Sequence, residues 1–206
     1  MSERLRLAVL ASGRGSNLGA ILAVCRRPDF PAHVVVVVSD RERAPALDLA
    51  RSAGVDAVFL DPKAYGDRTA YDAALLATLD GYRPGLVCLA GYMRILTPPF
   101  VRSWAGRLVN IHPSLLPAFP GLHAQRQALD YGVKLAGATV HFVEEGIDTG
   151  PIILQASVPV LPEDTEESLS ARILVEEHRI YPEAIRLFAA GRLVIRGRRV
   201  VVEEKT

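Results

Sequence analysis

A run of five consecutive valines, Val34 to Val38, is the feature that most limits how this chain can fold. Such a strand has no polar face to turn toward water, so both of its faces must be covered by other parts of the protein. Strands buried on both faces are typical of parallel sheets, whose crossover helices lie on either side. The run therefore predicts an α/β protein with a largely parallel sheet.

Predicted strands and helices alternate along the chain, as this fold class requires. Besides the valine strand (33–38), apolar runs predict strands at 5–11, 55–60, 86–90, 108–111, 136–143 and 152–158. Helical spacing predicts helices at 18–25, 44–53, 67–79, 99–104, 125–131 and 165–190. Pro182 is expected to kink or split the last helix, and 193–195 with 200–202 to form a hairpin. The prediction is a Rossmann-like, mostly parallel seven-stranded sheet flanked by helices, with a late antiparallel strand, a long C-terminal helix and a hairpin.

Composition argues against nucleic-acid, membrane and secreted classes. The 206-residue chain has a formal net charge of +1, so no general field draws it to nucleic acid or to an anionic membrane. It contains no run as long as a membrane span and no segment typical of a secretory leader. Its two cysteines, Cys25 and Cys88, lie far apart and outside any CxxC motif, which predicts buried thiols; a bridge between them is the alternative. A cytoplasmic protein is expected.

A glycine-containing segment, Ser12 to Leu18, joins the first predicted strand to the first predicted helix. Backbone N–H groups at such a junction, aided by the helix dipole, bind phosphate. The dinucleotide fingerprint is a rival, and Asp40 after the second strand resembles its ribose-binding acid. That fingerprint requires a third glycine at position 18, where this chain has a leucine, and the Gly-Lys-Ser/Thr motif of a P-loop is missing from the sequence. The segment is therefore predicted to bind a single phosphate group.

The groups available to that phosphate are the backbone amides, the Ser16 hydroxyl and the Asn17 amide, with Arg14 as a countercharge. The chain contains only two asparagines, and they stand at its two most motif-like sites, Asn17 here and Asn110 further on. A glycine turn that binds no ligand is the alternative interpretation.

The second motif-like site begins with Asn110 and His112, at the end of the fifth predicted strand. Side chains alternate along a strand, so these two point to the same face. Prolines at positions 113, 117 and 120 prevent further ladder pairing, so a stiff loop follows at once. Open α/β sheets bind ligands at such carboxyl ends of their strands. The alternative is an asparagine that caps a turn beside a histidine that belongs to the core.

An acidic loop lies between the sixth and seventh predicted strands, and within it Asp148 is held between glycines and followed by a proline. A carboxylate beside His112 would favour the imidazolium form. Together with the Asn110 amide, this arrangement would direct two donors at a developing oxyanion. No serine or cysteine stands where a nucleophile would, and the histidines lack metal-ligand spacing. The chemistry predicted is direct attack on a carbonyl by the substrate's own nucleophile, although a solvated acidic loop is the alternative.

Several segments of the sequence, in order and over nearly the whole chain, resemble the phosphoribosylglycinamide formyltransferases. They are 12–18, 89–96, 110–117, 120–123, 137–143 and 148–151. The resemblance implies the formyltransferase fold and a reaction in which 10-formyltetrahydrofolate donates its formyl group to the amine of glycinamide ribonucleotide in purine synthesis. It implies no metal.

The resemblance also implies roles for individual residues. Asn110 and His112 stabilise the oxyanion, while Asp148 keeps His112 protonated and helps to order a proton-relaying water. The residues implied for the ribonucleotide are Gly15, Ser16, Asn17 and Glu177. Those implied for the folate are Arg68, Met93, Arg94, Ile95, Leu96, Asn110, Val143, Glu144, Glu145, Gly146, Ile147 and Asp148. Without the resemblance, Met93 and Leu96 would be interpreted as core and Arg68 as a surface charge.

The resemblance further implies one formyltransferase domain over 1–206, with a phosphate-binding half at about 1–100 and a folate-binding, catalytic half at about 101–206. Its partners would be small-molecule substrates, without nucleic acid or membrane, and a homodimer is the assembly considered. The sequence departs from the family pattern at Arg14, at Leu174 and in the variable loop 145–147, which bears on affinity rather than on the reaction.

Three alternatives remain at this stage. A 10-formyltetrahydrofolate hydrolase shares the Asn, His and Asp set but carries a regulatory domain, for which no room is expected before Leu5. A methionyl-tRNA formyltransferase has a basic C-terminal domain, whereas this sequence ends in Glu-Glu-Lys-Thr. A non-catalytic phosphate-binding module would keep the glycine segment but would have no reason to hold Asn110, His112 and Asp148 together.

Overall fold

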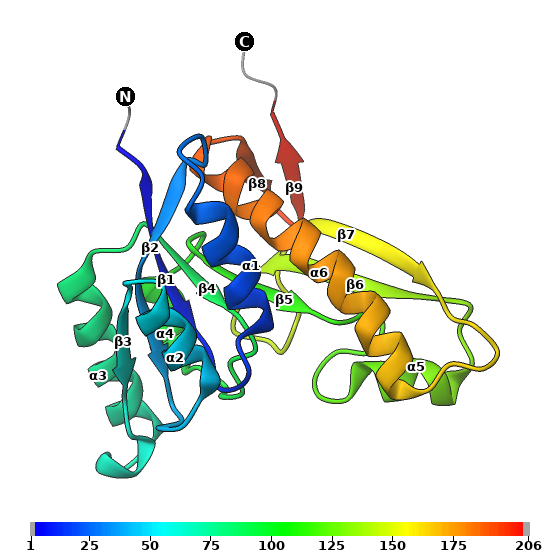
Figure 1. Ribbon diagram of the computed structural model, residues 1–206, viewed down its shortest axis with the longest axis horizontal. Coiled ribbons are helices and arrows are strands. Elements are labelled where there is room, and N and C mark those ends of the chain that lie inside the picture. The colour runs from blue at the N-terminus through cyan, green and yellow to red at the C-terminus, as the bar shows by residue number, and fades with distance from the viewer. Residues whose placement is uncertain (1–2, 204–206) are drawn as a thin grey trace. The chain divides into compact units, whose positions relative to one another are not determined.

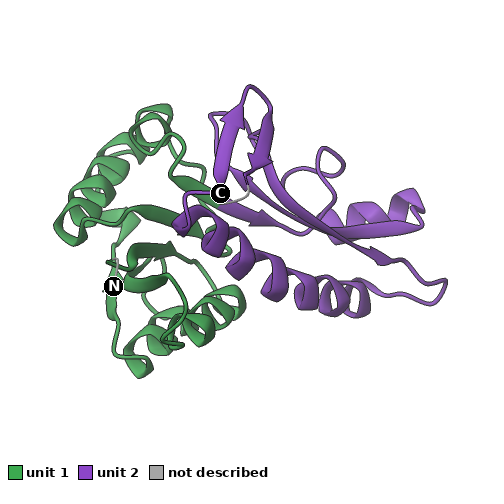
Figure 2. Ribbon diagram, turned by 90° about the horizontal axis from the view of Figure 1, so that it is seen from above, with its two compact units in different colours: residues 1–109 green, residues 110–206 purple. Residues whose placement is uncertain are grey.

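The computed structural model describes residues 3–203 and shows two compact units, Met1–Val109 and Asn110–Thr206 (Figures 1 and 2). Both units are built from strands and helices, in the order in which the sequence predicts them.

Unit 1 contains a parallel sheet with the strand order β3-β2-β1-β4. Its strands are β1 (Leu5–Leu10), β2 (Ala32–Ser39), β3 (Asp56–Phe59) and β4 (Leu86–Leu89). Its helical segments are α1 (Ser16–Cys25), α2 (Pro45–Ser52), η1 (Pro62–Ala64), α3 (Arg68–Tyr82) and α4 (Pro98–Ser103). The valine run lies in β2, where Val36, Val37 and Val38 are fully buried, as its lack of a polar face predicts. Because the strands are parallel, the segments that follow β1 and β4 emerge at the same edge of this sheet.

Unit 2 contains the later strands, in the order β5-β6-β7-β9-β8. They are β5 (Leu108–His112), which begins in the last two residues of unit 1, β6 (Leu135–Phe142), β7 (Ile152–Pro159), β8 (Leu193–Arg196) and β9 (Arg199–Val202). Strands β6 and β7 are antiparallel, and β8 and β9 form the terminal hairpin. Two helices, α5 (Ala124–Tyr131) and α6 (Glu166–Ala189), complete the unit, and α6 packs against β6 and β7.

The predicted fold class is confirmed, because the seven predicted strands and the two strands of the hairpin are all present. Of the two outcomes expected at Pro182, a kink or a split, the split does not occur, since α6 runs through Pro182 as one element (Figure 1). A proline removes one backbone N–H, but Ile180, Tyr181 and Ile185 on either side of it are buried. That buried face holds the two halves of the helix together. The short η1 was not predicted.

Both cysteines are buried and neither forms a disulfide, which confirms the expectation of buried thiols. Burial raises the pKa of the Cys25 thiol to about 11, despite the opposing effect of Arg4. Among residues 3–203, no helix is long and apolar enough to cross a membrane.

Replacing Gly137 by alanine is expected to destabilise the protein by about 1–3 kcal/mol, because overpacking a closed site forces its neighbours to move. Gly137 lies in β6, and an added Cβ would stand 2.0 Å from the carbonyl oxygen of Ala156 and 2.8 Å from a Leu115 methyl. Denaturant unfolding would measure the effect. Gly81→Ala is the control, because a Cβ at this α3 position meets nothing within 4 Å and adds helix propensity. Equal midpoints for wild type and Gly137→Ala would contradict the packing argument.

Candidate active site

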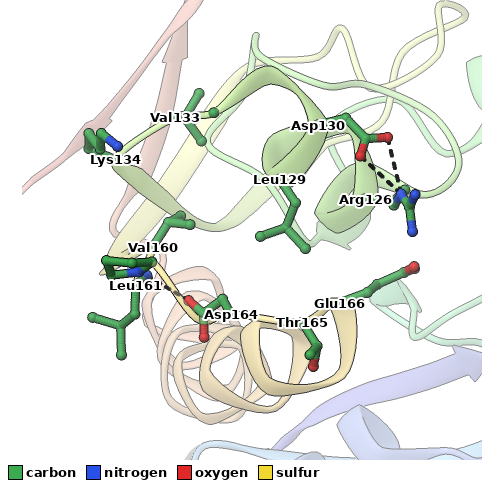
Figure 3. Close-up of a pocket in the computed structure, with 12 residues that line it drawn as sticks. Arg126, Leu129, Asp130, Val133, Lys134, Val160, Leu161, Asp164, Thr165 and Glu166 are labelled. Atoms are coloured by element: carbon green, nitrogen blue, oxygen red, sulfur yellow. Dashed lines mark hydrogen bonds and ion pairs between the residues drawn. The ribbon is translucent and has the colours of Figure 1, made fainter.

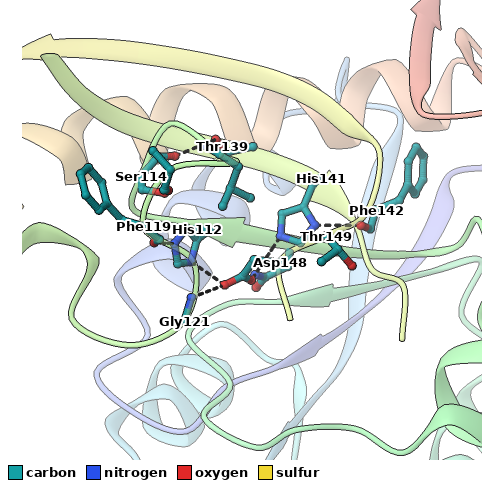
Figure 4. Close-up of polar contacts among 12 residues, drawn as sticks. His112, Ser114, Phe119, Gly121, Thr139, His141, Phe142, Asp148 and Thr149 are labelled. Atoms are coloured by element: carbon teal, nitrogen blue, oxygen red, sulfur yellow. Dashed lines mark hydrogen bonds and ion pairs between the residues drawn. The ribbon is translucent and has the colours of Figure 1, made fainter. Parts of the chain in front are cut away.

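The Asp148 carboxylate lies at the centre of a polar cluster in unit 2 (Figure 4). One oxygen, Oδ2, is 3.3 Å from His112 Nδ1 and accepts a hydrogen bond of 2.8 Å from the Gly121 N–H. The other, Oδ1, accepts a hydrogen bond of 3.4 Å from the Asn110 side-chain amide and lies 3.6 Å from His141 Nε2. The structure therefore brings together the three residues that the sequence singled out, Asn110, His112 and Asp148.

The strand geometry explains why Asn110 and His112 meet the same carboxylate. They are two residues apart in β5, so their side chains leave the same face of the strand. His112 is 5% exposed, and its Nε2 lies 2.9 Å from the carbonyl oxygen of Phe119. Both ring nitrogens of His112 thus face acceptors, Phe119 O on one side and Asp148 Oδ2 on the other. Each neutral tautomer can donate to one of these acceptors, and the imidazolium can donate to both.

The loop that follows β5 is fixed to the neighbouring strands through one hydroxyl. Thr139 Oγ1 donates to the carbonyl oxygen of Ser114 at 2.7 Å and accepts from the Leu116 N–H at 3.1 Å. Gln155 Nε2 contacts the same hydroxyl at 2.9 Å. Because Thr139 is fully buried, these bonds are shielded from water and hold the loop that brings Phe119 and Gly121 to the cluster.

Asp148 is itself held in an unusual backbone conformation, with φ of 52°, which aspartate tolerates better than most residues. Burial raises its pKa. The His141 hydrogen bond, the Gly121 N–H and the nearby histidine charges together lower the pKa by more than burial raises it, so it lies below its usual value. The carboxylate is therefore ionised at neutral pH and can act as the negative partner of His112.

His141 is a member of the cluster that sequence reasoning missed. It is 1% exposed, its Nδ1 lies 2.8 Å from the carbonyl oxygen of Phe142, and its Nε2 lies 3.3 Å from Asn110 Nδ2. Donation to Phe142 leaves Nε2 able to accept from Asn110 in the neutral form, or to donate toward Asp148 when protonated. A histidine near the end of the predicted strand 136–143 was a signal that could have identified it.

The glycine segment of unit 1 forms the junction between β1 and α1. Gly15, with φ of 77°, precedes the first residue of α1, and no side chain caps this helix. A Cβ at Gly15 would stand 2.9 Å from that of Ala46, so both its backbone conformation and the space around it require glycine. The first turn of α1 contains no acidic residue. Ser16 and the buried Asn17 open a helix N-terminus suited to an anion.

The predicted folate residues fall into both units. In unit 1, Met93 and Ile95 are 61% and 59% exposed in the loop after β4, whereas Leu96 is buried. The Arg94 guanidinium lies 4.6 Å from the centre of the Tyr71 ring, and Arg68 is the exposed first residue of α3.

In unit 2, Val143 is partly buried directly after β6, and 144–147 form an exposed loop before Asp148. Glu177, predicted for the ribonucleotide, is buried in α6.

A pocket elsewhere in unit 2 contains none of the predicted site residues (Figure 3). Residues of α5 and of the start of α6 line it, and its charged groups include the Arg126–Asp130 pair at 3.1 Å. Asp164, which also lines it, accepts two hydrogen bonds from Arg172, and this pairing lowers the pKa of Asp164 well below its usual range. Over the described residues 3–203, no group of three or more His, Cys, Asp or Glu could hold a metal ion.

The fold and the cluster define an α/β domain that places a polar site at the carboxyl end of a strand, as open α/β sheets do when they bind ligands. The model of the formyl transferase family matches residues 5–185, and the chain belongs to that family.

Named relatives agree with this assignment. Phosphoribosylglycinamide formyltransferase of Escherichia coli (strain K12) is 49% identical over 92% of this chain and 89% of its own length. The trifunctional purine biosynthetic protein adenosine-3 of Drosophila melanogaster is 50% identical over 94% of this chain. The matched region is 14% of the length of that longer protein. The crystal structure of glycinamide ribonucleotide transformylase 1 from Symbiobacterium toebii has a TM-score of 0.97 at 61% identity, covering 99% of this chain and 96% of that one.

Proposed function

We propose that this chain transfers the formyl group of 10-formyltetrahydrofolate to the amine of 5'-phosphoribosylglycinamide, giving formylglycinamide ribonucleotide and tetrahydrofolate in de novo purine synthesis. The observation that supports this reaction best is that Asn110 and His112 both contact the ionised carboxylate of Asp148. The relatives named phosphoribosylglycinamide formyltransferase support the choice of substrates.

In the proposed reaction the glycinamide nitrogen attacks the formyl carbon, and the new C–N bond turns the carbonyl oxygen into an oxyanion. Asn110 Nδ2–H and His112 Nε2–H donate to that oxygen. In the structure Nε2 faces the carbonyl oxygen of Phe119 at 2.9 Å, so the substrate oxygen would replace that carbonyl as the acceptor. Asp148 keeps His112 protonated throughout. The bond between the formyl carbon and N10 then breaks, and a proton passes from the attacking amine to N10 through a water that Asp148 helps to order.

The two substrates would be held by separate sets of residues. The phosphate would take the amides of Gly15, Ser16 and Asn17 at the start of α1, because that helix end is uncapped and free of acidic residues. Glu177 would contact the ribose–glycinamide portion. The folate contacts proposed in unit 1 are the apolar side chains of 93–96, with Arg68 and Arg94 as cationic contacts, and those proposed in unit 2 are the loop 143–148.

Further parts of the proposal follow from the same assignment. We infer a single formyltransferase domain with small-molecule substrates, no nucleic-acid or membrane partner, no metal requirement, a cytoplasmic location and a homodimer as its assembly. The size of the protein in solution would test the last of these.

A turnover assay with both substrates tests the proposed function. Tetrahydrofolate release is followed from 10-formyltetrahydrofolate with and without glycinamide ribonucleotide. Release that depends on the ribonucleotide is the expected result, with formylated ribonucleotide appearing in equal amount. Release without the ribonucleotide would instead indicate a 10-formyltetrahydrofolate hydrolase. Ribonucleotide binding without any release would indicate a phosphate-binding module.

A further inference from the structure

The loop after β4, Gly91–Thr97, has an open central part. Within the described residues 3–203, the backbone amides of Arg94, Ile95 and Leu96 donate no hydrogen bond. Met93 and Ile95 are among the most exposed large apolar side chains of unit 1. Arg94 also lines a pocket of unit 1 together with Ser12. The centre of this loop thus offers unpaired donors next to apolar surface, which suits a flat ligand with a polar edge.

Ser12 holds the first half of this loop. Its backbone N–H donates to the carbonyl oxygen of Gly91 at 3.0 Å, and its Oγ accepts a hydrogen bond of 2.8 Å from the Met93 N–H. The side chain therefore fixes the direction of the amide immediately before the open part. Ser12 is also the first residue of the glycine segment, so one residue connects the predicted phosphate loop to the Gly91–Thr97 loop.

Residues of α3 hold the second half. Asp72 is 3% exposed, and its Oδ2 accepts a hydrogen bond of 2.6 Å from the Thr97 N–H, which directly follows the open part. The neighbouring Tyr71 hydroxyl lies 3.0 Å from that of Tyr92, and the Tyr71 ring lies under the Arg94 guanidinium. Both ends of the open part are thus fixed by side chains from other elements of unit 1.

We propose that Ser12 and Asp72 are positioning residues, which hold residues 93–96 in the conformation that binds the folate. This inference rests on the proposed function. Neither side chain needs to touch the folate: each orders the loop before the ligand arrives, so that binding costs less conformational entropy. Losing either bond should therefore weaken folate binding more than it slows the chemical step.

Five variants and steady-state kinetics test the proposal. Ser12→Ala and Asp72→Ala remove the acceptors, whereas Ser12→Thr and Asp72→Asn retain one. Ser103→Ala is the matched control, because Ser103 is the last residue of α4 and its hydroxyl donates to the Phe100 carbonyl, not to the loop. We expect the two acceptor-free variants to raise KM for 10-formyltetrahydrofolate about five- to tenfold, the size of one lost hydrogen bond. Ser12→Thr and Ser103→Ala should stay within about twofold of wild type by the same scale.

The separate effects of a variant on KM for the folate and on kcat distinguish a positioning role from general damage to the enzyme. In Ser12→Ala, kcat at saturating folate should stay within about threefold of wild type. An unchanged folate KM in Ser12→Ala, or an equal fall in kcat for Ser12→Ala and Ser12→Thr, would overturn the proposal. If Asp72→Ala does not fold, the Ser12 pair decides alone.

A binding measurement separates this inference from the proposed function. Calorimetric titration with tetrahydrofolate needs no turnover. Wild type that binds tetrahydrofolate but transfers no formyl group would contradict the proposed function, and weaker binding by Ser12→Ala would still support the positioning role. Equal tetrahydrofolate affinity for wild type, Ser12→Ala and Ser12→Thr would refute the positioning role even if wild type proves to be a transferase.

Discussion

Replacing Asp148 by asparagine is expected to lower kcat about 10²–10⁴-fold, the range associated with a positioned acid–base group. The amide has nearly the same shape and can still accept from the Gly121 N–H, which donates at 2.8 Å in the native structure. It lacks the negative charge that stands 3.3 Å from His112 Nδ1. In the proposed mechanism that charge keeps His112 protonated, so its loss would remove a donor to the oxyanion.

The measurement is kcat at saturating concentrations of both substrates, with unfolding midpoints recorded in parallel. Asp164→Asn is the matched control, because it removes a carboxylate of unit 2 that pairs with Arg172 outside the cluster. That variant should keep its turnover. Near-wild-type turnover in Asp148→Asn would overturn the role assigned to Asp148, and a large fall in both midpoint and kcat would assign the loss to folding.

Replacing Asn110 by alanine is expected to lower kcat about 10²–10³-fold, the usual effect of removing one oxyanion donor. Asn110→Asp should be at least as damaging. It replaces the donor with an acceptor, and the new carboxylate would face Asp148 Oδ1 at the site of the present 3.4 Å hydrogen bond. Because the donated bond develops with the oxyanion, kcat should fall more than KM rises.

A double variant, Asn110→Ala with Asp148→Asn, shows whether the two residues act together. If both serve one oxyanion through one cluster, the combined loss should be clearly smaller than the product of the single losses. Multiplicative effects would mean that the two residues act independently, against the shared role proposed here.

The parts of the fold that the sequence predicted correctly are those with strong local patterns. The valine run could only be a strand covered on both faces, and the helix predicted from 165 does begin there, with Thr165 and Ser168 forming a capping box. Of the kink or split expected at Pro182, the split did not occur, although a proline disfavours the middle of a helix. Local propensity was outweighed by the buried residues on both sides of the proline.

The residues of the candidate site also divide into those that the sequence predicted and those that it did not. Asn110 and His112 could be paired from the period of a strand alone, and Asp148 stood out in its glycine-bounded loop. The carbonyl of Phe119 and the amide of Gly121 could not be predicted, because every residue has these backbone groups and only the folded chain selects which ones meet a side chain. His141 was missed although its place near the end of a predicted strand was a signal, because the sequence does not show that its ring meets Asp148.

The burial of both cysteines has a practical consequence for studying loop motion. Thiol reagents react with the thiolate, so we expect slow labelling of both native thiols near neutral pH, because both are buried and burial raises the pKa of Cys25. A cysteine introduced at Ile147, which is 57% exposed in the loop before Asp148, would therefore be the only site that a fluorescent maleimide labels. The wild-type cysteine content thus allows a single reporter to follow that loop as substrates bind.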